Sequence, residues 1–398
     1  MAIEPLAVAA CTATNALGHG VAASLAALRR GESGLRPCDF EDAVLDTWIG
    51  RVAGLEEEPL GGEFATFDCR NNRLARRGLE QDNFAAAVRD ARVRYGADRI
   101  GVFVGTSTSG IGATEHAYRQ RDPVTGGLPE TFDYQHTHNV FSVADFTRRW
   151  LGLAGVALAI STACSSSAKA FASAWRHMRA GFCDAAVVGG VDSLCLTTLY
   201  GFNALGLASC RPCRPWDAER DGLNIGEAAG FALLEWATPD DAHVLLRGYG
   251  ESSDAYHMTA AHPEGVGAVL AMRQALARAD TMPEQVDYIN LHGTATPLND
   301  AAEDRAVLRV FGSETPCSST KGWTGHTLGA AGITEAILVC LCLEHGLIPG
   351  TLNTHQRDPK LGAGVVLENR ERPLRVALSN SFGFGGSNCS LLFGRRDM

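Results

Sequence analysis

One pattern of residues occurs in both halves of this chain, and it limits the folds that the chain can adopt. In the first half, Ser161–Cys164 opens a segment of small residues that ends at Gly181 and precedes an apolar run. In the second half, Gly325–Gly332 opens a similar segment, which ends at Gly346 and precedes a strand that leads into Gly383–Gly386. A duplicated βα unit accounts for this repeat. A chance similarity between two Gly- and Ala-rich segments is the alternative.

Short apolar runs alternate with helical segments along the chain, which is typical of an α/β fold. We predict strands at Ile100–Val104, Ala185–Val191, Gly230–Glu235, Tyr288–Leu291 and Val376–Leu378. Apolar residues at three- and four-residue spacing predict helices at Asn83–Tyr95, Ser165–Ala180, Gly267–Arg278 and Ala331–Glu344. A single core rarely grows beyond about 250–300 residues. The 398 residues therefore favour two halves, which we place at residues 1–240 and 241–398.

Charge and hydropathy exclude several classes of protein. The chain has 35 basic and 45 acidic residues, and its net charge of −10 has the wrong sign for a general nucleic-acid binder. No apolar run reaches the ~20 residues that span a bilayer. The N-terminus carries Glu4 and no basic stretch before its first apolar run, unlike a secretory signal. We therefore expect a cytoplasmic protein.

The cysteines do not indicate a disulfide framework or a metal site. Twelve cysteines in 398 residues are too sparse for a disulfide scaffold. Cys210-Arg-Pro-Cys213 is the single CxxC pair, and neither a second pair nor a nearby histidine completes a zinc site. We expect a reducing compartment, no metal and no cofactor.

Cys164 is the candidate nucleophile, because it stands at the start of a predicted helix. The positive end of the helix dipole and the unpaired N–H groups are expected to lower the pKa of its thiol and to favour the thiolate. Small flanking residues leave space for a substrate. A buried structural cysteine is the alternative.

Two histidines lie in strand-to-helix loops. His292 directly follows a predicted strand, where α/β proteins place ligand sites, and His326 leads into the second small-residue helix. A helix N-terminus disfavours imidazolium, so we expect a neutral His326 that donates an N–H. With Cys164, the two histidines form a nucleophile and two hydrogen-bond donors. A structural role is the alternative for a lone histidine, and neither has a second ligand at metal spacing.

Two further features point to the same site. The segment Asn380–Asn388 is rich in glycine, fits neither a dinucleotide loop nor a P-loop, and suits one half of an oxyanion hole. Only three of the 35 basic residues are lysines, and one of them, Lys321, lies five residues before His326. We favour a site role for Lys321 over that of an ordinary surface charge.

Nearly the whole chain resembles the elongating β-ketoacyl-acyl-carrier-protein synthases, which belong to the thiolase-fold condensing enzymes. The resemblance rests on Thr162-Ala-Cys164, Arg214-Pro-Trp-Asp217, Arg220-Asp-Gly222, Gly226-Glu-Ala-Ala-Gly230, His292-Gly-Thr294, Lys321–Gly332 and Asn380–Asn388. It implies two thiolase-like ββαβα-type halves in a five-layer α-β-α-β-α core. The implied reaction is the decarboxylative Claisen condensation of a malonyl-carrier protein with a bound acyl group, in fatty-acid or polyene/polyketide chain elongation.

The resemblance also implies roles for single residues. Cys164 matches the nucleophile that receives the acyl chain. His292 and His326 match the pair that assists malonyl decarboxylation and stabilises the enolate. Lys321 matches the lysine beside them, which pairs with an acidic residue that corresponds to Glu335.

The implied substrate pocket draws on several loops. The backbone N–H groups of Cys164 and Phe384 match the oxyanion hole, and Thr108 matches a position that gates acyl-chain length. The substrate-binding positions implied by the resemblance are Thr108, Phe202, Thr294, Thr296, Phe382, Gly383 and Gly385.

A basic cluster on an acidic chain indicates a docking surface. Arg70 and Arg73 match positions that contact the acidic face of the acyl carrier protein in relatives, and Arg76 and Arg77 follow closely. A solvated helix face is the alternative. The expected partners are therefore an acyl carrier protein that brings acyl and malonyl groups, and a second subunit. That subunit is a copy of this chain or a related ketosynthase-like chain.

The chain departs from the family at two positions, where Ala229 and Ala295 replace the usual glycine. Neither change removes a reactive group. Thiolases and initiating synthases use one histidine with a second cysteine or an asparagine, so the histidine pair argues against both. A non-catalytic partner subunit typically lacks the nucleophile, whereas this chain has Cys164. We favour an active synthase, with a specialised subunit of a heterodimeric ketosynthase/chain-length-factor pair as the alternative.

Overall fold

The computed structural model describes residues 2–238 and 244–395. The predicted boundary between residues 240 and 241 therefore lies outside the described residues, and the division into 1–240 and 241–398 stays a prediction.

Eleven strands in the described part of the chain form one sheet, in the order β12-β11-β15-β16-β10-β1-β9-β7-β5-β6, with β2 paired to β1. Its strands are β1 (Leu6–Asn15), β2 (Gly18–His19), β5 (Ile100–Gly105), β6 (Ala157–Ile160), β7 (Ala185–Asp192), β9 (Ala228–Trp236), β10 (Leu245–Ser253), β11 (Tyr288–Asn290), β12 (Cys317–Ser318), β15 (Val376–Gly383) and β16 (Ser387–Gly394). Smaller sheets join β3 (Arg36–Pro37), β4 (Trp48–Gly50) and β8 (Ile225–Gly226), and β13 (Leu347–Ile348) and β14 (Arg370–Glu371).

The two halves of the large sheet repeat one topology. In the first half, β5 pairs in parallel with β6 and β7, and the sheet continues antiparallel through β9 to β1. In the second half, β11 pairs in parallel with β12 and β15, and the sheet continues antiparallel through β16 to β10. The halves meet where β1 pairs with β10 at Leu6 and Ala7. The predicted α/β duplication is therefore confirmed by strand order.

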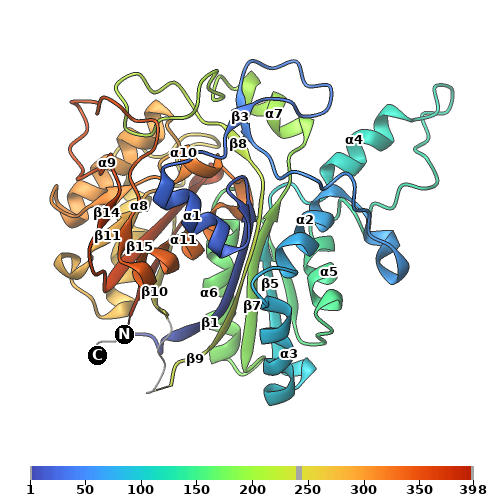
Figure 1. Cartoon of the computed structure of the whole chain (residues 1–398), viewed down its shortest axis with the longest axis horizontal. Helices are drawn as coiled ribbons and strands as arrows, with labels where there is room; N and C mark the ends of the chain where they lie inside the picture. Colours follow the sequence, from blue (N-terminus) through green and yellow to red (C-terminus); the bar gives the residue numbers. More distant parts are fainter. Residues whose placement is uncertain (1, 239–243, 396–398) are drawn as a thin grey trace.

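Helices separate and cover the two halves (Figure 1). The central layer consists of α6 (Ser166–Arg179) and α11 (Ala331–His345). The first half is covered by α2 (Arg70–Leu79), α3 (Phe84–Tyr95) and α5 (Ser142–Trp150), and the second by α8 (Val266–Ala279) and α9 (Pro297–Phe311). The remaining helices are α1 (Val21–Arg30), α4 (Ile111–Arg119), α7 (Leu196–Ala204), α10 (Lys321–Thr324) and short 3₁₀ turns at Gly62–Phe67, Ala97–Arg99, Pro283–Gln285, Leu328–Ala330 and Phe384–Gly386. This is the expected α-β-α-β-α layering.

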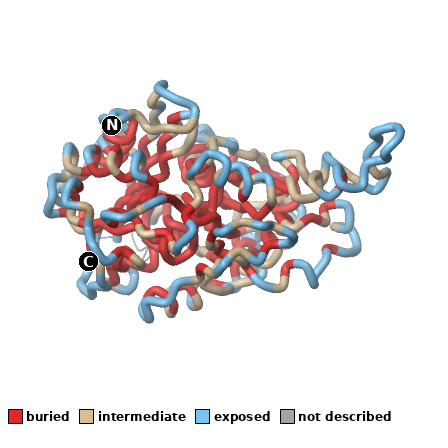
Figure 2. Tube along the Cα trace, turned by 90° about the horizontal axis from the view of Figure 1, so that it is seen from above, coloured by how far each residue is buried: buried red, intermediate tan, exposed pale blue. Residues whose placement is uncertain are grey.

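The core is centred on α11, which packs on every side and is apolar over most of its circumference, with the buried Glu335 as its charged exception. Every residue from Ala331 to Leu343 is buried, and Figure 2 shows the buried trace through the middle of the molecule. The stretch Leu328–His345 is long and apolar enough to cross a membrane by length and composition, but 89% of it is buried inside the protein. It is therefore placed as a core helix.

Candidate active site

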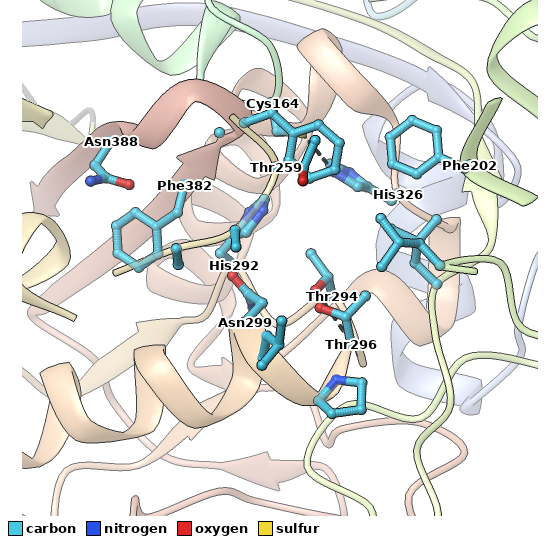
Figure 3. Close-up of a pocket in the computed structure, with 18 of the residues that line it drawn as sticks. Cys164, Phe202, Thr259, His292, Thr294, Thr296, Asn299, His326, Phe382 and Asn388 are labelled. Carbon is cyan, nitrogen blue, oxygen red and sulfur yellow. Dashed lines mark hydrogen bonds between the residues drawn. The ribbon is translucent and has the colours of Figure 1, made fainter. Parts of the chain in front are cut away.

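Cys164 lies on the turn that joins β6 to α6. Ala163 adopts φ +53°, a left-handed conformation that is costly for a residue with a Cβ, so the turn before the thiol is strained. Two serines brace it: Ser165 Oγ donates to Thr162 O at 2.9 Å, and Ser166 Oγ accepts from Thr162 N at 2.9 Å. The turn places Cys164 in the wall of a cavity (Figure 3).

The thiol of Cys164 is protonated in the resting site. Burial raises its pKa to about 11, although the charge of Lys321 and a hydrogen bond from the N–H of Phe384 act in the opposite direction. The expected lowering of this pKa by the helix N-terminus is therefore wrong. The reason is that burial is the largest influence on this pKa, and α6 begins only at Ser166, two residues beyond the thiol. His326 Nε2 lies 3.0 Å from Cys164 Sγ, so a base is in place when the thiol reacts.

His292 and His326 approach each other from separate loops, with ring centroids 5.3 Å apart and planes at 83°. Both are buried, and their pKa values lie well below the ordinary value, first because of burial and then because of the Lys321 charge. The neutral state expected for His326 agrees with this direction, but burial and Lys321 cause it rather than a helix end. Two neutral imidazoles at one cavity can donate N–H groups to a developing negative charge.

Lys321 forms a buried ion pair beneath the histidines. Its Nζ lies 2.5 Å from Glu335 Oε1 and 3.4 Å from His292 Nδ1, and it also donates to the backbone carbonyl of His292. Both partners are buried, and burial raises the pKa of Glu335 to about 7 although Lys321 acts against it. Because Lys321 is buried, it is not the ordinary surface charge. Its contact with Nδ1 favours the His292 tautomer whose proton is on Nε2.

The glycine-rich turn after β15 closes against the nucleophile. The backbone N–H of Phe384 bonds to the Cys164 sulfur. A Cβ at Gly383 would lie 2.8 Å from Thr162 O and 3.3 Å from Cys164 N, so a larger residue would push this turn away. The N–H groups of Cys164 and Phe384 thus lie on adjoining turns, as a two-donor oxyanion hole requires.

One cavity of about 220 Å³ opens onto these groups (Figure 3). Phe202 and Phe384 stack over it, with centroids 5.6 Å apart and planes at 21°. The predicted site residues that line it are Cys164, Phe202, His292, Thr294, Thr296, His326, Phe382, Gly383 and Phe384. Thr108 and Gly385 are not among its lining residues: Thr108 is buried against Asp192, and the N–H of Gly385 donates to Met258 O.

Sequence reasoning missed a buried carboxylate behind the histidine loop. Glu303 on α9 accepts the backbone N–H groups of His292 and Gly293 at 2.8 Å each, and Asn380 donates to it at 3.2 Å. Burial raises the pKa of Glu303 to about 7. In the sequence, Glu303 is recognisable only as an acidic residue in the helix that follows His292. That position does not indicate a role, because only the fold packs α9 against the His292 loop.

The four predicted docking arginines are engaged within the protein. Arg70 bonds to the fully buried Glu227 at 2.6 Å and also pairs with Glu56. Arg73 pairs with Asp68, Arg76 pairs with Glu58 and Glu80, and Arg77 pairs with Glu58. Their side chains are only 15–21% exposed. The structure therefore gives Arg70 a structural partner, and docking by these arginines stays a prediction.

The two departures from glycine have different surroundings. Ala295 adopts φ +65° and is fully buried, so its methyl imposes strain on the loop after His292. Ala229 lies in β9, and a Cβ on Gly78 of α2 would come within 3.0 Å of its methyl. The alanine therefore fits only because α2 presents a glycine there.

The CxxC pair is not arranged as a pair of equivalent ligands. Cys213 is buried and its thiol donates to the Lys321 carbonyl at 3.2 Å, whereas Cys210 is exposed. Within the described residues, a possible metal-ligand group is formed by Cys164, His292 and His326, whose ligand atoms lie within 4.8 Å of one another. The neighbouring Lys321 charge disfavours a cation there.

Comparison with protein families matches both halves. The description "Beta-ketoacyl synthase, N-terminal domain" covers residues 4–239, and "Beta-ketoacyl synthase, C-terminal domain" covers residues 243–355. The 3-oxoacyl-[acyl-carrier-protein] synthase 2 of Vibrio cholerae is 32% identical, over 95% of this chain and 96% of that protein. The mitochondrial 3-oxoacyl-[acyl-carrier-protein] synthase of Arabidopsis thaliana is 41% identical over 268 residues, and this chain spans 57% of its length.

Solved structures are similar over the whole chain. A ketosynthase in complex with its chain length factor from Xenorhabdus doucetiae has a TM-score of 0.88 and 36% identity, covering 99% of this chain and 98% of that one. The ishigamide ketosynthase/chain length factor has a TM-score of 0.87 and 28% identity over all of both chains. A type II PKS acyl-carrier protein complex with its hexaketide-bound ketosynthase has a TM-score of 0.88 and 25% identity, covering 99% and 100%.

Proposed function

The chain belongs to the β-ketoacyl synthase family, and from this premise we propose its reaction. It catalyses decarboxylative condensation between a malonyl thioester and an acyl group held on Cys164. The contact that carries this proposal is the 3.0 Å approach of His326 Nε2 to Cys164 Sγ beside a second neutral histidine. The chain is thus an acyltransferase of the β-ketoacyl-carrier-protein synthase type.

Acyl transfer begins at Cys164. As Sγ attacks the thioester carbonyl, its proton passes to His326 Nε2, because a thiol with a pKa of about 11 is not ionised beforehand. The carbonyl oxygen gains charge against the N–H groups of Cys164 and Phe384. The carrier thiolate then leaves and takes the proton from His326, which becomes neutral again.

Decarboxylation uses both histidines as donors. The bond between the malonyl carboxylate and its α-carbon breaks, CO₂ leaves, and the electron pair forms an enolate at the thioester. His292 supplies its Nε2–H, since Lys321 faces its Nδ1. The Nδ1 of His326 has no hydrogen-bond partner among the described residues, so no contact fixes the tautomer of this ring. Once the thiol is acylated, His326 can adopt the tautomer whose proton is on Nε2. Neutral donors stabilise the enolate without protonating its carbon.

Condensation returns the site to its starting state. The enolate carbon attacks the acyl carbonyl on Cys164, and the same two backbone N–H groups receive the second oxyanion. The C–S bond breaks, the β-ketoacyl product stays on its carrier, and the Cys164 thiolate takes up a proton that the solvent supplies. Lys321 and Glu335 hold His292 in place in this scheme, and Thr294, Thr296, Phe202 and Phe382 line the substrate channel.

We assign an acyl carrier protein and a second subunit as partners. A solved relative is a carrier-protein complex, and two are ketosynthase/chain-length-factor pairs. The similarity to these pairs favours a second candidate, a heterodimer. In such a pair this chain would be the reactive subunit, because it has Cys164 and both histidines. A homodimer is the other form, and the pathway served is fatty-acid or polyene/polyketide elongation. A cytoplasmic location stays a prediction.

The test is loading followed by condensation. The purified chain is incubated with malonyl-carrier protein and a panel of acyl-carrier proteins, while CO₂ release and intact mass are recorded. We expect a gain of one acyl group that is absent in Cys164→Ala, followed by β-ketoacyl product. Failure of every primer to load would reject a synthase that acts alone, and reconstitution with a ketosynthase-like partner chain would then test the heterodimer.

A further inference from the structure

Asp192, the last residue of β7, is a buried carboxylate that the steps above do not use. It is fully buried, and within residues 2–238 and 244–395 it forms no ion pair with a basic side chain. A buried carboxylate is costly unless several donors satisfy it. The donors around Asp192 come from two loops of the active site.

The first loop follows β5. Thr106 Oγ1 and Ser107 Oγ each donate to Asp192 at 2.6 Å, and Thr108 Oγ1 donates at 2.8 Å. The backbone N–H groups of Ser107 and Thr108 donate at 3.0 and 2.9 Å. Five donors of one tight turn therefore converge on a single carboxylate, which fixes the backbone at Thr108.

The second loop follows His326. The N–H of Gly329 donates to Asp192 Oδ2 at 2.6 Å. Leu328, the residue before it, adopts φ +53°, and a Cβ at Gly329 would lie 2.7 Å from Asp192 Oδ2. The turn between His326 and Gly329 is thus strained, and it approaches Asp192 so closely that only glycine fits.

We propose that Asp192 is a positioning residue that fastens the turn after His326 to the loop that contains Thr108. This inference rests on the proposed function, which makes the His326 loop catalytic. Thr108, in the loop after β5, is the position that the family resemblance assigns to acyl-chain length. Asp192 does not touch the reacting atoms; it acts through His326 at one end and Thr108 at the other. The other end of the His326 segment is held beside β8: His326 N donates to the carbonyl of Asn224, the residue before that strand, at 2.7 Å, and Gly226 N of β8 donates to His326 O at 2.9 Å.

An amide cannot replace this carboxylate. Oδ1 accepts the N–H of Thr108, and Oδ2 accepts the N–H of Gly329. In Asp192→Asn, the NH₂ group must face one of these two N–H donors, whichever way the side chain is turned. One of the two loops is therefore released, while the volume of the side chain is unchanged.

The charge of Asp192 supplies a readout that a merely structural residue would lack. It raises the pKa of the Cys164 thiol, as Glu335 does, whereas Lys321 and the N–H of Phe384 lower it. His292 and His326, which also face the thiol, are neutral. Removing the Asp192 charge should therefore shift the alkylation of Cys164 to lower pH.

The experiment compares Asp192→Asn with Asp217→Asn as a matched control. Asp217 is also buried and accepts three backbone N–H groups, from Glu219, His355 and Gln356, but it lies outside the cavity. We expect both variants to lose thermal stability.

Only Asp192→Asn should lower kcat for malonyl decarboxylation, by about 10²-fold as for a misplaced catalytic group. Its KM for malonyl-carrier protein should stay within about twofold, because the carrier contacts are not changed. Only this variant should shift the pH profile of Cys164 alkylation.

Equal behaviour of the two variants in kcat and in the pH profile would overturn the proposal. If Asp192→Asn does not fold, Ser107→Ala removes one donor and should change kcat in the same direction by a smaller factor; an unchanged kcat would count against the proposal. The alkylation profile needs no substrate. A wild-type chain that releases no CO₂ would therefore reject a synthase that acts alone, while the alkylation profile would still decide the role of Asp192.

Discussion

The ammonium of Lys321 lies 2.5 Å from Glu335 Oε1, and both groups are buried between the two halves of the fold. Lys321 belongs to α10 and Glu335 to α11, so the pair ties the loop before His326 to the central helix. The same ammonium contacts His292, which makes the pair a link between both histidine loops.

Removing one member of this pair should destabilise the protein and inactivate it. Glu335→Gln or Lys321→Met leaves a buried charge without its partner, which costs about 3–5 kcal/mol of unfolding free energy. The double variant Lys321→Met/Glu335→Leu should regain most of that stability, because two apolar groups replace two charges. It should not regain decarboxylation. Urea unfolding and CO₂ release measure the two effects, and a double variant that condenses normally would contradict the assigned role.

The Cys164 thiol should alkylate like an ordinary buried thiol. Because its pKa is raised to about 11, the rate with iodoacetamide should keep rising from pH 7 to pH 10. Peptide mass mapping in a Cys210→Ser background separates this signal from the exposed Cys210. A rate that is already constant between pH 7 and 8 would indicate the helix-lowered thiol that the structure argues against.

Substitutions of the two histidines should impair different steps of the reaction. His292→Ala should load acyl groups normally but lose decarboxylation, by about 10²–10³-fold as for a lost oxyanion donor. His326→Ala should lose both steps, since its Nε2 contacts Cys164 Sγ. Because both pKa values are lowered, titration of the two histidines should contribute no inflection near pH 6.5 to the pH profile of decarboxylation. Intact mass and CO₂ release give the two rates, and equal defects in loading would contradict this division.

Glu303 should make the protein less stable as the pH rises. Its pKa is raised to about 7 from an ordinary value of 4.5, so its contribution is fully present below pH 4.5 and is lost as the pH rises through 7. Glu303→Gln should flatten the slope of unfolding free energy over this range, whatever it does to the absolute value. Denaturant unfolding at several pH values measures the slope, and an unchanged slope would show that Glu303 is not the titrating group. Glu335 and Asp300, with pKa values raised to about 7 and 6, keep part of the slope in the variant.

Substitution of Arg70 should act mainly on the stability of the protein, and substitution of Arg76 tests the predicted binding of the carrier protein. Arg70→Ala leaves the fully buried Glu227 without its ion-pair partner and should cost about 3–5 kcal/mol of unfolding free energy. Arg76→Ala breaks a pair with the half-exposed Glu58 and should cost about 0–1 kcal/mol. Unfolding and the KM for malonyl-carrier protein test the two roles separately. A raised KM in Arg76→Ala with unchanged stability would support the docking prediction, and an unchanged KM would oppose it.

The sequence by itself determined the elements and the reacting groups. Apolar periodicity placed α3, α6, α8 and α11 to within one residue at either end, because their buried faces repeat at helical spacing. Strands β5, β7 and β11 followed from short apolar runs bounded by turns. Cys164, His292, His326 and Lys321 were found because unusual residues at strand-to-helix loops are visible without coordinates.

Only the tertiary structure decided the pKa values and the interaction partners of these groups. The sequence predicted a lowered thiol pKa from the helix N-terminus, whereas burial of Cys164 raises it. The local sequence indicates that Cys164 lies near a helix N-terminus, but it does not indicate how deeply the rest of the chain buries the thiol. It also showed Arg70 as a basic residue, but not that Glu227, far along the chain, neutralises it. Asp192 and Glu303 were missed for the same reason: a carboxylate that holds distant backbone N–H groups has no local pattern, because the fold alone brings its donors together.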